Sequence, residues 1–209
     1  STGKSENKFG VDFDAIPDLY ARAAKELAHV KLRGLQMHIG SQLTSIQPFI
    51  EAVEKAAPLA THLKNTHGIE FWSIGGGIVY HDSLDSGSPA WWAAKSEAER
   101  PLTIAEYGEA LVPRLQHLGL KILLEPGRYI VGNAGVLLTK CLYEKRGKAK
   151  TFKVVDAGMN DLIRPALYEG HHEIAPLQQP TGEMRKVDVV GPICESGDFF
   201  CQDRELPDF

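Results

Sequence analysis

The alternation of helix-like and strand-like segments over the first two thirds of the chain limits most strictly how it can fold. Apolar residues recur at helical spacing in three segments, residues 16–27, 49–63 and 104–118. A strand-like run follows each of them, at residues 35–39, 71–74 and 121–125. Thr103-Ile104-Ala105-Glu106 is a capping box, which predicts the start of the third helix. Repeated units of this kind predict a parallel sheet covered by helices.

Three strands are too few for a closed eight-stranded barrel, which typically needs about 250 residues. We therefore expect a piece of a (β/α)8 TIM-type barrel up to about Asn133. After Asn133, strand-like segments at residues 136–143, 151–155 and 187–190 follow one another without long helices, so the chain predicts the start of a mostly β second domain. Residues 78–100, with Trp91 and Trp92, interrupt the pattern and are typical of a functional lid or an interface loop.

The composition excludes several classes of protein. With 43% hydrophobic residues, 24% charged residues and a formal net charge of −4, the 209 residues are typical of a globular protein without a nucleic-acid-binding surface. We find neither a stretch of about 18 apolar residues nor a secretory signal. The three cysteines form no C-x-x-C pair, which indicates reduced thiols in a cytoplasmic protein and no metal site. The chain begins without methionine and ends just after an acidic stretch, so we expect a fragment that lacks both ends.

The most informative motif is Glu125-Pro126-Gly127-Arg128, directly after the apolar run of the third strand. A carboxylate at the C-terminal end of a parallel strand lies where α/β barrels build their sites. The proline-glycine turn then lets backbone amides and Arg128 approach an anionic group. The alternative is a strand end with a turn and a surface ion pair.

Two further motifs end strands at the same edge. His38 could stack on a planar cofactor and Ser41 could donate to a phosphate, although a lone strand histidine is also common in ordinary packing. Gly75-Gly76-Gly77 lets backbone N–H groups approach an anion, which suits a phosphate cradle, or else it is a flexible turn. The G-x-G-x-x-G spacing of dinucleotide-binding loops is missing.

The region after Asn133 carries two polar motifs. Arg164 and Tyr168 share one face if their segment is helical, which fits carboxylate recognition or, alternatively, a capping or interface cluster. Cys194-Glu195-Ser196-Gly197-Asp198 follows a Gly-Pro break. Neighbouring acids disfavour a thiolate, so Cys194 is a poor nucleophile but can be a proton donor; a structural buried cysteine is the alternative.

Together these motifs resemble the diaminopimelate decarboxylases, in the pyridoxal-phosphate-dependent group that includes ornithine and arginine decarboxylases and shares its barrel with alanine racemase. Five motifs occur in family order, from Ser1-Thr2-Gly3 and Lys8-Phe9-Gly10 onward, so the resemblance covers essentially the whole chain. It implies that residues 1–133 are the C-terminal part of the pyridoxal-phosphate-binding barrel and that residues 134–209 begin a β-rich second domain. It also implies a carboxy-lyase that makes L-lysine and CO2 from meso-2,6-diaminopimelate, the last step of lysine biosynthesis.

The resemblance implies a role for each candidate residue. The catalytic residues would be His38, which would stack on the pyridine ring, Glu125, which would keep the ring nitrogen protonated, and Cys194, which would protonate the carbanion. The cofactor would further be held by Ser41, Gly75, Gly76, Gly77, Pro126, Gly127 and Arg128. The substrate's distal carboxylate would be bound by Arg128, Arg164 and Tyr168, and its distal ammonium by Glu195. In the family, Cys194 and Glu195 reach the active site of the other subunit, which implies a homodimer.

Charge favours diaminopimelate as the substrate. Its far end carries a carboxylate and an ammonium, which Arg164 and Glu195 can match, whereas ornithine has no distal carboxylate. A decarboxylase of ornithine or carboxynorspermidine is an alternative, as are a non-catalytic regulatory homologue and a racemase on the same barrel.

The sequence departs from the family pattern in two ways that matter for activity. The family's Schiff-base lysine belongs to the first barrel strand, and none of Lys4, Lys8 and Lys25 occupies a matching position. We therefore expect the 209 residues alone to be inactive. In addition, Ile78-Val79-Tyr80 follows the glycines where the family usually has an apolar residue and another glycine, as if two residues of the phosphate loop were deleted.

Overall fold

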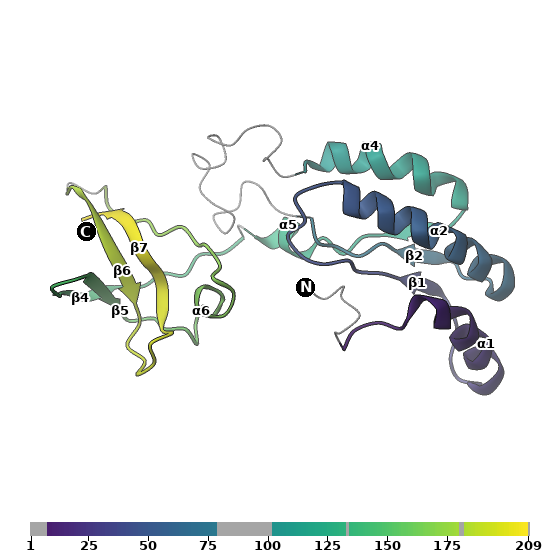
Figure 1. The fold of residues 1–209 in the computed structure, drawn as a ribbon, viewed down its shortest axis with the longest axis horizontal. Helices are drawn as coiled ribbons and strands as arrows, with labels where there is room; N and C mark the ends of the chain where they lie inside the picture. Colours follow the sequence, from purple (N-terminus) through teal and green to yellow (C-terminus); the bar gives the residue numbers. More distant parts are fainter. Residues whose placement is uncertain (1–7, 79–101, 133, 180–181, 209) are drawn as a thin grey trace. The chain divides into compact units, whose positions relative to one another are not determined.

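The computed structural model describes residues 8–78, 102–132, 134–179 and 182–208. These residues form a mixed α/β fold that divides into two compact units, with the change from the first to the second after Val131 (Figure 1). The lid or interface loop expected at residues 78–100 lies, apart from Ile78, outside the described residues. The identification of residues 1–133 and 134–209 as domains of a larger protein stays a prediction.

The first unit contains a three-stranded parallel sheet in the order β1-β2-β3. Its strands are β1 (Gly34–Gln36), β2 (Phe71–Ser73) and β3 (Lys121–Leu123). The central strand aligns Trp72 with Leu35 on one side and with Ile122 on the other. Trp72 is fully buried, as expected for the middle of a parallel sheet that helices cover. Because the strands are parallel, their C-terminal ends meet at one edge.

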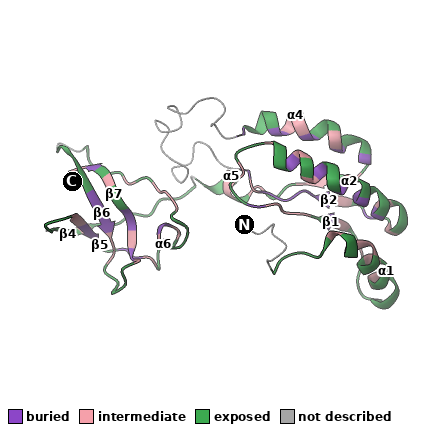
Figure 2. Ribbon diagram, in the orientation of Figure 1, coloured by how far each residue is buried: buried purple, intermediate pink, exposed green. Residues whose placement is uncertain are grey.

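Helices cover this sheet, and in Figure 2 two of them carry buried positions along the face that packs into the core, whereas the first one contributes partly buried residues. They are α1 (Ile16–Glu26), after a short 3-10 turn at Phe13–Ala15, α2 (Gln47–His67), and α4 (Ile104–Leu115), which continues as a 3-10 turn at Gln116–Leu118. Helices α2 and α4 lie side by side, and the rings of Phe49 and Tyr107 meet edge to face at 5.1 Å between centroids. The predicted capping box is confirmed, since Thr103 Oγ1 accepts from the Glu106 N–H and the Glu106 carboxylate accepts from the Thr103 N–H. No described helix is long and apolar enough to cross a membrane.

The short helix α5 (Gly127–Val131) ends the first unit, and the second unit is a four-stranded sheet in the order β4-β5-β6-β7. Its strands are β4 (Cys141–Arg146), β5 (Thr151–Val155), β6 (Met184–Val190) and β7 (Phe199–Pro207). The central pair β5–β6 is parallel, whereas the two outer pairs are antiparallel. Between β5 and β6 lies the one-turn helix α6 (Arg164–Tyr168). A small apolar core includes Val155, Val187, Val189 and Phe200.

The prediction of a partial (β/α)8 TIM-type barrel is wrong. In the described part of the chain, β1 and β3 are the outer strands of an open three-stranded sheet, and β4 to β7 form a separate mixed sheet. A barrel requires a closed ring of tilted, staggered strands. The apolar periodicity that suggested a partial barrel indicates only local helix–strand units, and such units occur in open sheets as well.

Candidate functional site

The carboxylate of Glu125 is held at the edge where the three parallel strands end. Its Oε1 accepts a hydrogen bond from Ser73 Oγ at 2.5 Å and a longer one from Gln36 Nε2 at 3.5 Å. The backbone N–H of Glu125 donates to the carbonyl oxygen of Gly75 at 2.8 Å, which extends the pairing of β2 and β3. The side chain is exposed, and among the described residues none donates to its Oε2. One carboxylate oxygen is therefore fixed by two strands while the other is open to a ligand.

His38 lies at the same edge, after β1. Its half-buried ring accepts a hydrogen bond at Nδ1 from the backbone N–H of Gly76, at 3.4 Å. Because Nδ1 acts as the acceptor, this contact requires an unprotonated Nδ1. The bond anchors the imidazole beside the glycine segment, so the structure brings His38 and the glycines together as the sequence predicted.

The three glycines lie between backbone segments that pack too closely for any side chain. A Cβ on Gly76 would lie 2.0 Å from the carbonyl oxygen of Glu125, and one on Gly77 would lie 2.2 Å from that of Gly40. Gly75 and Gly77 also have φ angles of +77° and +97°, which favour glycine. The segment is thus a close-packed crossing of backbones, and not the flexible turn that the sequence also allowed.

The remaining cofactor candidates follow the same strand ends. Ser41 is exposed in the turn after His38. The Pro126–Arg128 turn opens helix α5, in which the Gly127 N–H donates to the carbonyl oxygen of Glu125 at 2.8 Å and Arg128 is half-buried. All candidate residues of the first unit therefore gather at one sheet edge.

In the second unit, one buried acid joins the two polar motifs that the sequence singled out. Asp198 is only 3% exposed, and its carboxylate oxygens accept the backbone N–H groups of Met159 at 2.6 Å and Ile193 at 2.7 Å. The sequence placed Asp198 in a motif but gave it no role. The sequence does contain a pattern that could have indicated this structural role, namely the Gly191-Pro192 break followed by a short acidic loop. In such loops an aspartate often accepts hydrogen bonds from nearby backbone amides.

Asp198 holds a loop that exposes Cys194 and Glu195. The Glu195 carboxylate accepts the Gly197 N–H at 3.1 Å and the Ser196 hydroxyl at 3.0 Å. These bonds, the backbone one first, lower the pKa of Glu195 and favour its anionic form. Cys194 is a free thiol on the surface of the second unit. Within this unit it is therefore not the buried structural cysteine that the sequence allowed as the alternative.

Arg164 and Tyr168 are the first and last residues of α6, so they share one face of this single helical turn. Arg164 is half-buried, and its Nη1 lies 3.2 Å from Nε2 of His172, a residue that the sequence did not suggest. Tyr168 is 69% exposed. The two residues therefore present a guanidinium and a phenol on the second unit, which also carries Cys194 and Glu195.

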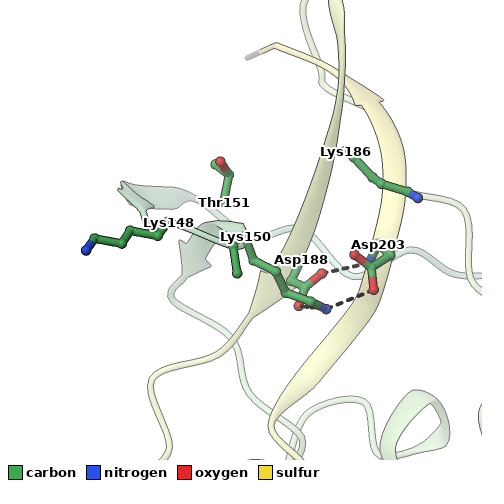
Figure 3. A pocket seen from close by; sticks show the side chains of 8 residues that line it. Lys148, Lys150, Thr151, Lys186, Asp188 and Asp203 are labelled. Atoms are coloured by element: carbon green, nitrogen blue, oxygen red, sulfur yellow. Dashed lines mark hydrogen bonds and ion pairs between the residues drawn. The ribbon is translucent and has the colours of Figure 1, made fainter.

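A pocket of about 250 Å³ in the second unit contains none of these candidates. It lies beside the β4–β5 turn, where Lys150 Nζ contacts the carboxylates of Asp188 and Asp203, each at 2.9 Å (Figure 3). The lysine occupies the space between the two acids, while Lys148 extends away from them. Among the described residues no group of three or more His, Cys, Asp or Glu could hold a metal ion.

Comparison with known proteins gives a consistent family. A family model matches residues 18–209, and its description is "pyridoxal-dependent decarboxylase, C-terminal sheet domain". Because this description names a sheet domain, it also argues against a barrel portion. Diaminopimelate decarboxylases of Vibrio cholerae and Campylobacter jejuni are 42% and 44% identical to this chain, each match covering 99% of it and 46% and 48% of the relative. A crystal structure of diaminopimelate decarboxylase from Helicobacter pylori complexed with L-lysine matches with a TM-score of 0.82 and 39% identity, over 100% of this chain and 48% of that one. The chain spans about half the length of the curated relatives it matches. The match of the family model over most of its length shows that the chain belongs to the pyridoxal-dependent decarboxylases.

Proposed function

We propose that the protein carrying this chain is a diaminopimelate decarboxylase, which converts meso-2,6-diaminopimelate to L-lysine and CO2. The observation that carries the proposal is the sheet edge where Glu125, held by Ser73 at 2.5 Å, lies next to the His38–Gly76 contact. Close-packed glycines, an oriented carboxylate and an imidazole at the ends of parallel strands form a set that suits a flat, phosphate-bearing cofactor. The names of relatives at about 40% identity support the substrate.

The donor and acceptor groups at this edge fit pyridoxal phosphate. The open Oε2 of Glu125 would hold a proton at the ring nitrogen, and His38 would stack on the ring. Ser41, the glycine backbone at Gly75 to Gly77 and the backbone of the Pro126–Arg128 turn would hold the phosphate. When bound, this cofactor supplies a ring that withdraws electrons from the carbon that loses CO2. Ser73 and Gln36 would keep the carboxylate of Glu125 in the orientation that this role requires.

The second unit offers the groups that the far end of diaminopimelate requires. Arg164 and Tyr168, together with Arg128, would bind the distal carboxylate, because a guanidinium matches a carboxylate with two parallel donors. Glu195, whose bonds to Gly197 and Ser196 favour the anion, would bind the distal ammonium. The exposed thiol of Cys194 would give a proton to the carbon that has lost CO2.

Product analysis on the complete protein tests the substrate. We expect lysine from meso-diaminopimelate and no putrescine from ornithine when each is supplied with pyridoxal phosphate. Putrescine alone would establish an ornithine decarboxylase. No product from either substrate, in a protein that binds pyridoxal phosphate, would favour a non-catalytic regulatory homologue. The 209 residues by themselves are expected to release no lysine.

We also propose a homodimer with shared active sites, as the family resemblance implies. Two inactive variants, Glu125→Ala and Cys194→Ala, test it when they are mixed and allowed to exchange subunits. If each site takes these residues from different subunits, mixed dimers contain one intact site, and about a quarter of the parental activity returns. No recovery, in a mixture whose subunits have exchanged, would show that each subunit supplies its own site.

A further inference from the structure

The chain folds back onto Arg164 directly after helix α6. Glu169 ends the helix with a φ angle of +53°, in the left-handed region. The N–H of Gly170 then donates to the carbonyl oxygen of Arg164 at 3.1 Å, six residues earlier, and so satisfies a carbonyl group at the end of the helix. A Cβ on Gly170 would lie only 3.3 Å from Arg164 Nη1, so the returning chain packs along the arginine side chain. This reversal brings His172 to the guanidinium.

The contact between His172 and Arg164 has a defined direction. Arg164 Nη1 lies 3.2 Å from His172 Nε2. A guanidinium has donors only, so the bond exists when Nε2 of His172 is the acceptor, and the neutral ring then carries its proton on Nδ1. One of the five donors of Arg164 is thereby directed at a fixed acceptor, which restricts the plane of the guanidinium.

His172 and its neighbour His171 both contact Arg204 of strand β7. Arg204 donates through Nη1 to the carbonyl oxygen of His172, and its Nη2 lies 3.2 Å from Nδ1 of His171. On its other side, Nε2 of His171 lies 3.5 Å from the carboxylate of Glu173. Helix α6 packs on β7, so Arg204 joins the histidine segment to the sheet that supports the helix. His172 is therefore a fixed acceptor.

We infer that His172 is a positioning residue, which holds the guanidinium of Arg164 ready for the second carboxylate of the substrate, with Arg204 as its anchor. The claim that Arg164 awaits a substrate carboxylate rests on the proposed function, whereas the claim that His172 orients Arg164 does not. An arginine that is ordered before binding loses less side-chain freedom when it meets a carboxylate. His172 would therefore favour substrates with a distal carboxylate and have little effect on ligands without one.

Kinetics of the complete enzyme test the inference with His172→Leu, which removes the acceptor, and His172→Gln, which keeps one. For the Leu variant we expect KM for diaminopimelate to rise roughly 3- to 10-fold, the range for ordering one long side chain, with kcat within about twofold. The inhibition constant of cadaverine, a diamine without any carboxylate, should stay within about twofold of the parental value, because it does not depend on Arg164. The Gln variant should recover most of the loss, and His62→Leu, at an exposed position of α2, should change nothing.

A rise in KM for diaminopimelate without weaker inhibition by cadaverine would support the inference, and an equal loss of affinity for both, or an unchanged KM, would overturn it. Crystal structures of the same variants give a readout that does not depend on activity. The guanidinium of Arg164 should move in the Leu variant and stay in the Gln variant. If the parental protein does not act on diaminopimelate, the proposed function fails, and an unmoved guanidinium in the Leu variant would separately refute positioning by His172. Should the Leu variant not fold, Arg204→Gln, which releases the same segment from β7, decides by the same two measurements.

Discussion

The buried carboxylate of Asp198 accepts the backbone N–H of Met159 at 2.6 Å, across 39 residues of sequence. Its second oxygen accepts the N–H of Ile193, in the loop that also carries Cys194 and Glu195. A Cβ on Gly191 would lie 2.4 Å from the same carboxylate, so the loop closes tightly around it. Asp198 is thus the point at which the turn after β5 and the Cys194–Glu195 loop are joined.

Replacement of this acid is expected to destabilise the second unit. Asp198→Ala leaves two backbone N–H groups without their acceptor, and each unsatisfied buried group costs roughly 1–3 kcal/mol. We expect the free energy of unfolding to fall by about 3 kcal/mol, measured by urea denaturation of the complete protein. Gln202→Ala, at an exposed position of β7, is the control and should change stability by less than about 0.5 kcal/mol. Equal stability of the two variants would contradict this account of Asp198.

Gly76 is expected to tolerate no side chain. In Gly76→Ala the new methyl group would lie 2.0 Å from the carbonyl oxygen of Glu125, so the ends of β2 and β3 must separate. We expect a loss of roughly 3 kcal/mol or more in the free energy of unfolding, with weaker binding of pyridoxal phosphate.

The matched control for this substitution is Gly108→Ala. Gly108 lies inside α4, and a Cβ there would have nothing within 4 Å. Alanine is a better helix former than glycine by about 1 kcal/mol, so this variant should be as stable as the parent or more stable. Thermal melting of the two variants side by side measures the contrast, and a stable Gly76→Ala protein would refute the close-packed crossing.

Glu125→Gln tests the proposed role of the carboxylate in catalysis. A charge-assisted hydrogen bond contributes roughly 1.5–3 kcal/mol, so its loss should lower kcat by about one to two powers of ten, or more if the ring loses its proton. The fold should be retained, because Ser73 can still donate to the amide oxygen. Glu109→Gln, on the exposed face of α4, is the control. A variant with parental kcat would exclude Glu125 as the partner of the ring nitrogen.

Tyr107 gives a prediction about alkaline pH. Burial raises the pKa of its phenol to about 12, and among the described residues its hydroxyl has no hydrogen-bond partner. Since the pKa is raised on folding, stability is fully present below the ordinary pKa of about 10 and is lost as the pH rises toward 12. Between these values the free energy of unfolding should fall by at most about 1.4 kcal/mol per pH unit from this group.

Tyr107→Phe separates this effect from other alkaline titrations. The variant should be as stable as the parent at pH 7, or slightly more stable, because it removes a buried hydroxyl without a partner and keeps the edge-to-face packing on Phe49. In urea titrations between pH 10 and 12 the parent should lose stability relative to the variant. Parallel curves for the two proteins would show that Tyr107 does not titrate in this range.

Local signals in the sequence predicted the elements of the first unit well. The capping box at Thr103 marks the start of α4, and Gly119 ends the following turn with a φ angle of +61°. The strand predicted at residues 71–74 is β2, with Ile74 pairing just beyond its end. These features depend on a few neighbouring residues, so the sequence contains them directly. How strands assemble into a larger sheet depends on distant segments, and here the expectation of a partial barrel was wrong.

Elements and contacts that depend on tertiary partners were harder to predict. Residues 136–143 were predicted as one strand, yet Val136 is 90% exposed and β4 begins only at Cys141. Strand β7 was not predicted, because its side chains do not alternate regularly between the two faces of the sheet. Asp203 interrupts that alternation, since it has a φ angle of +50° and donates its N–H to the Asp188 carboxylate. The contact of His172 with Arg164 depends on the reversal at Glu169, which no periodicity reveals.

The crossing of backbones at Gly75 to Gly77 limits how this protein could be redesigned. A library that varies these three positions should yield almost no folded members, because every other amino acid places an atom inside a neighbouring carbonyl group. New substrate preferences must therefore be sought at residues whose side chains have room to change, such as the exposed Tyr168 on α6. The main chain fixes the shape of this segment, so selectivity would have to be changed through side chains elsewhere.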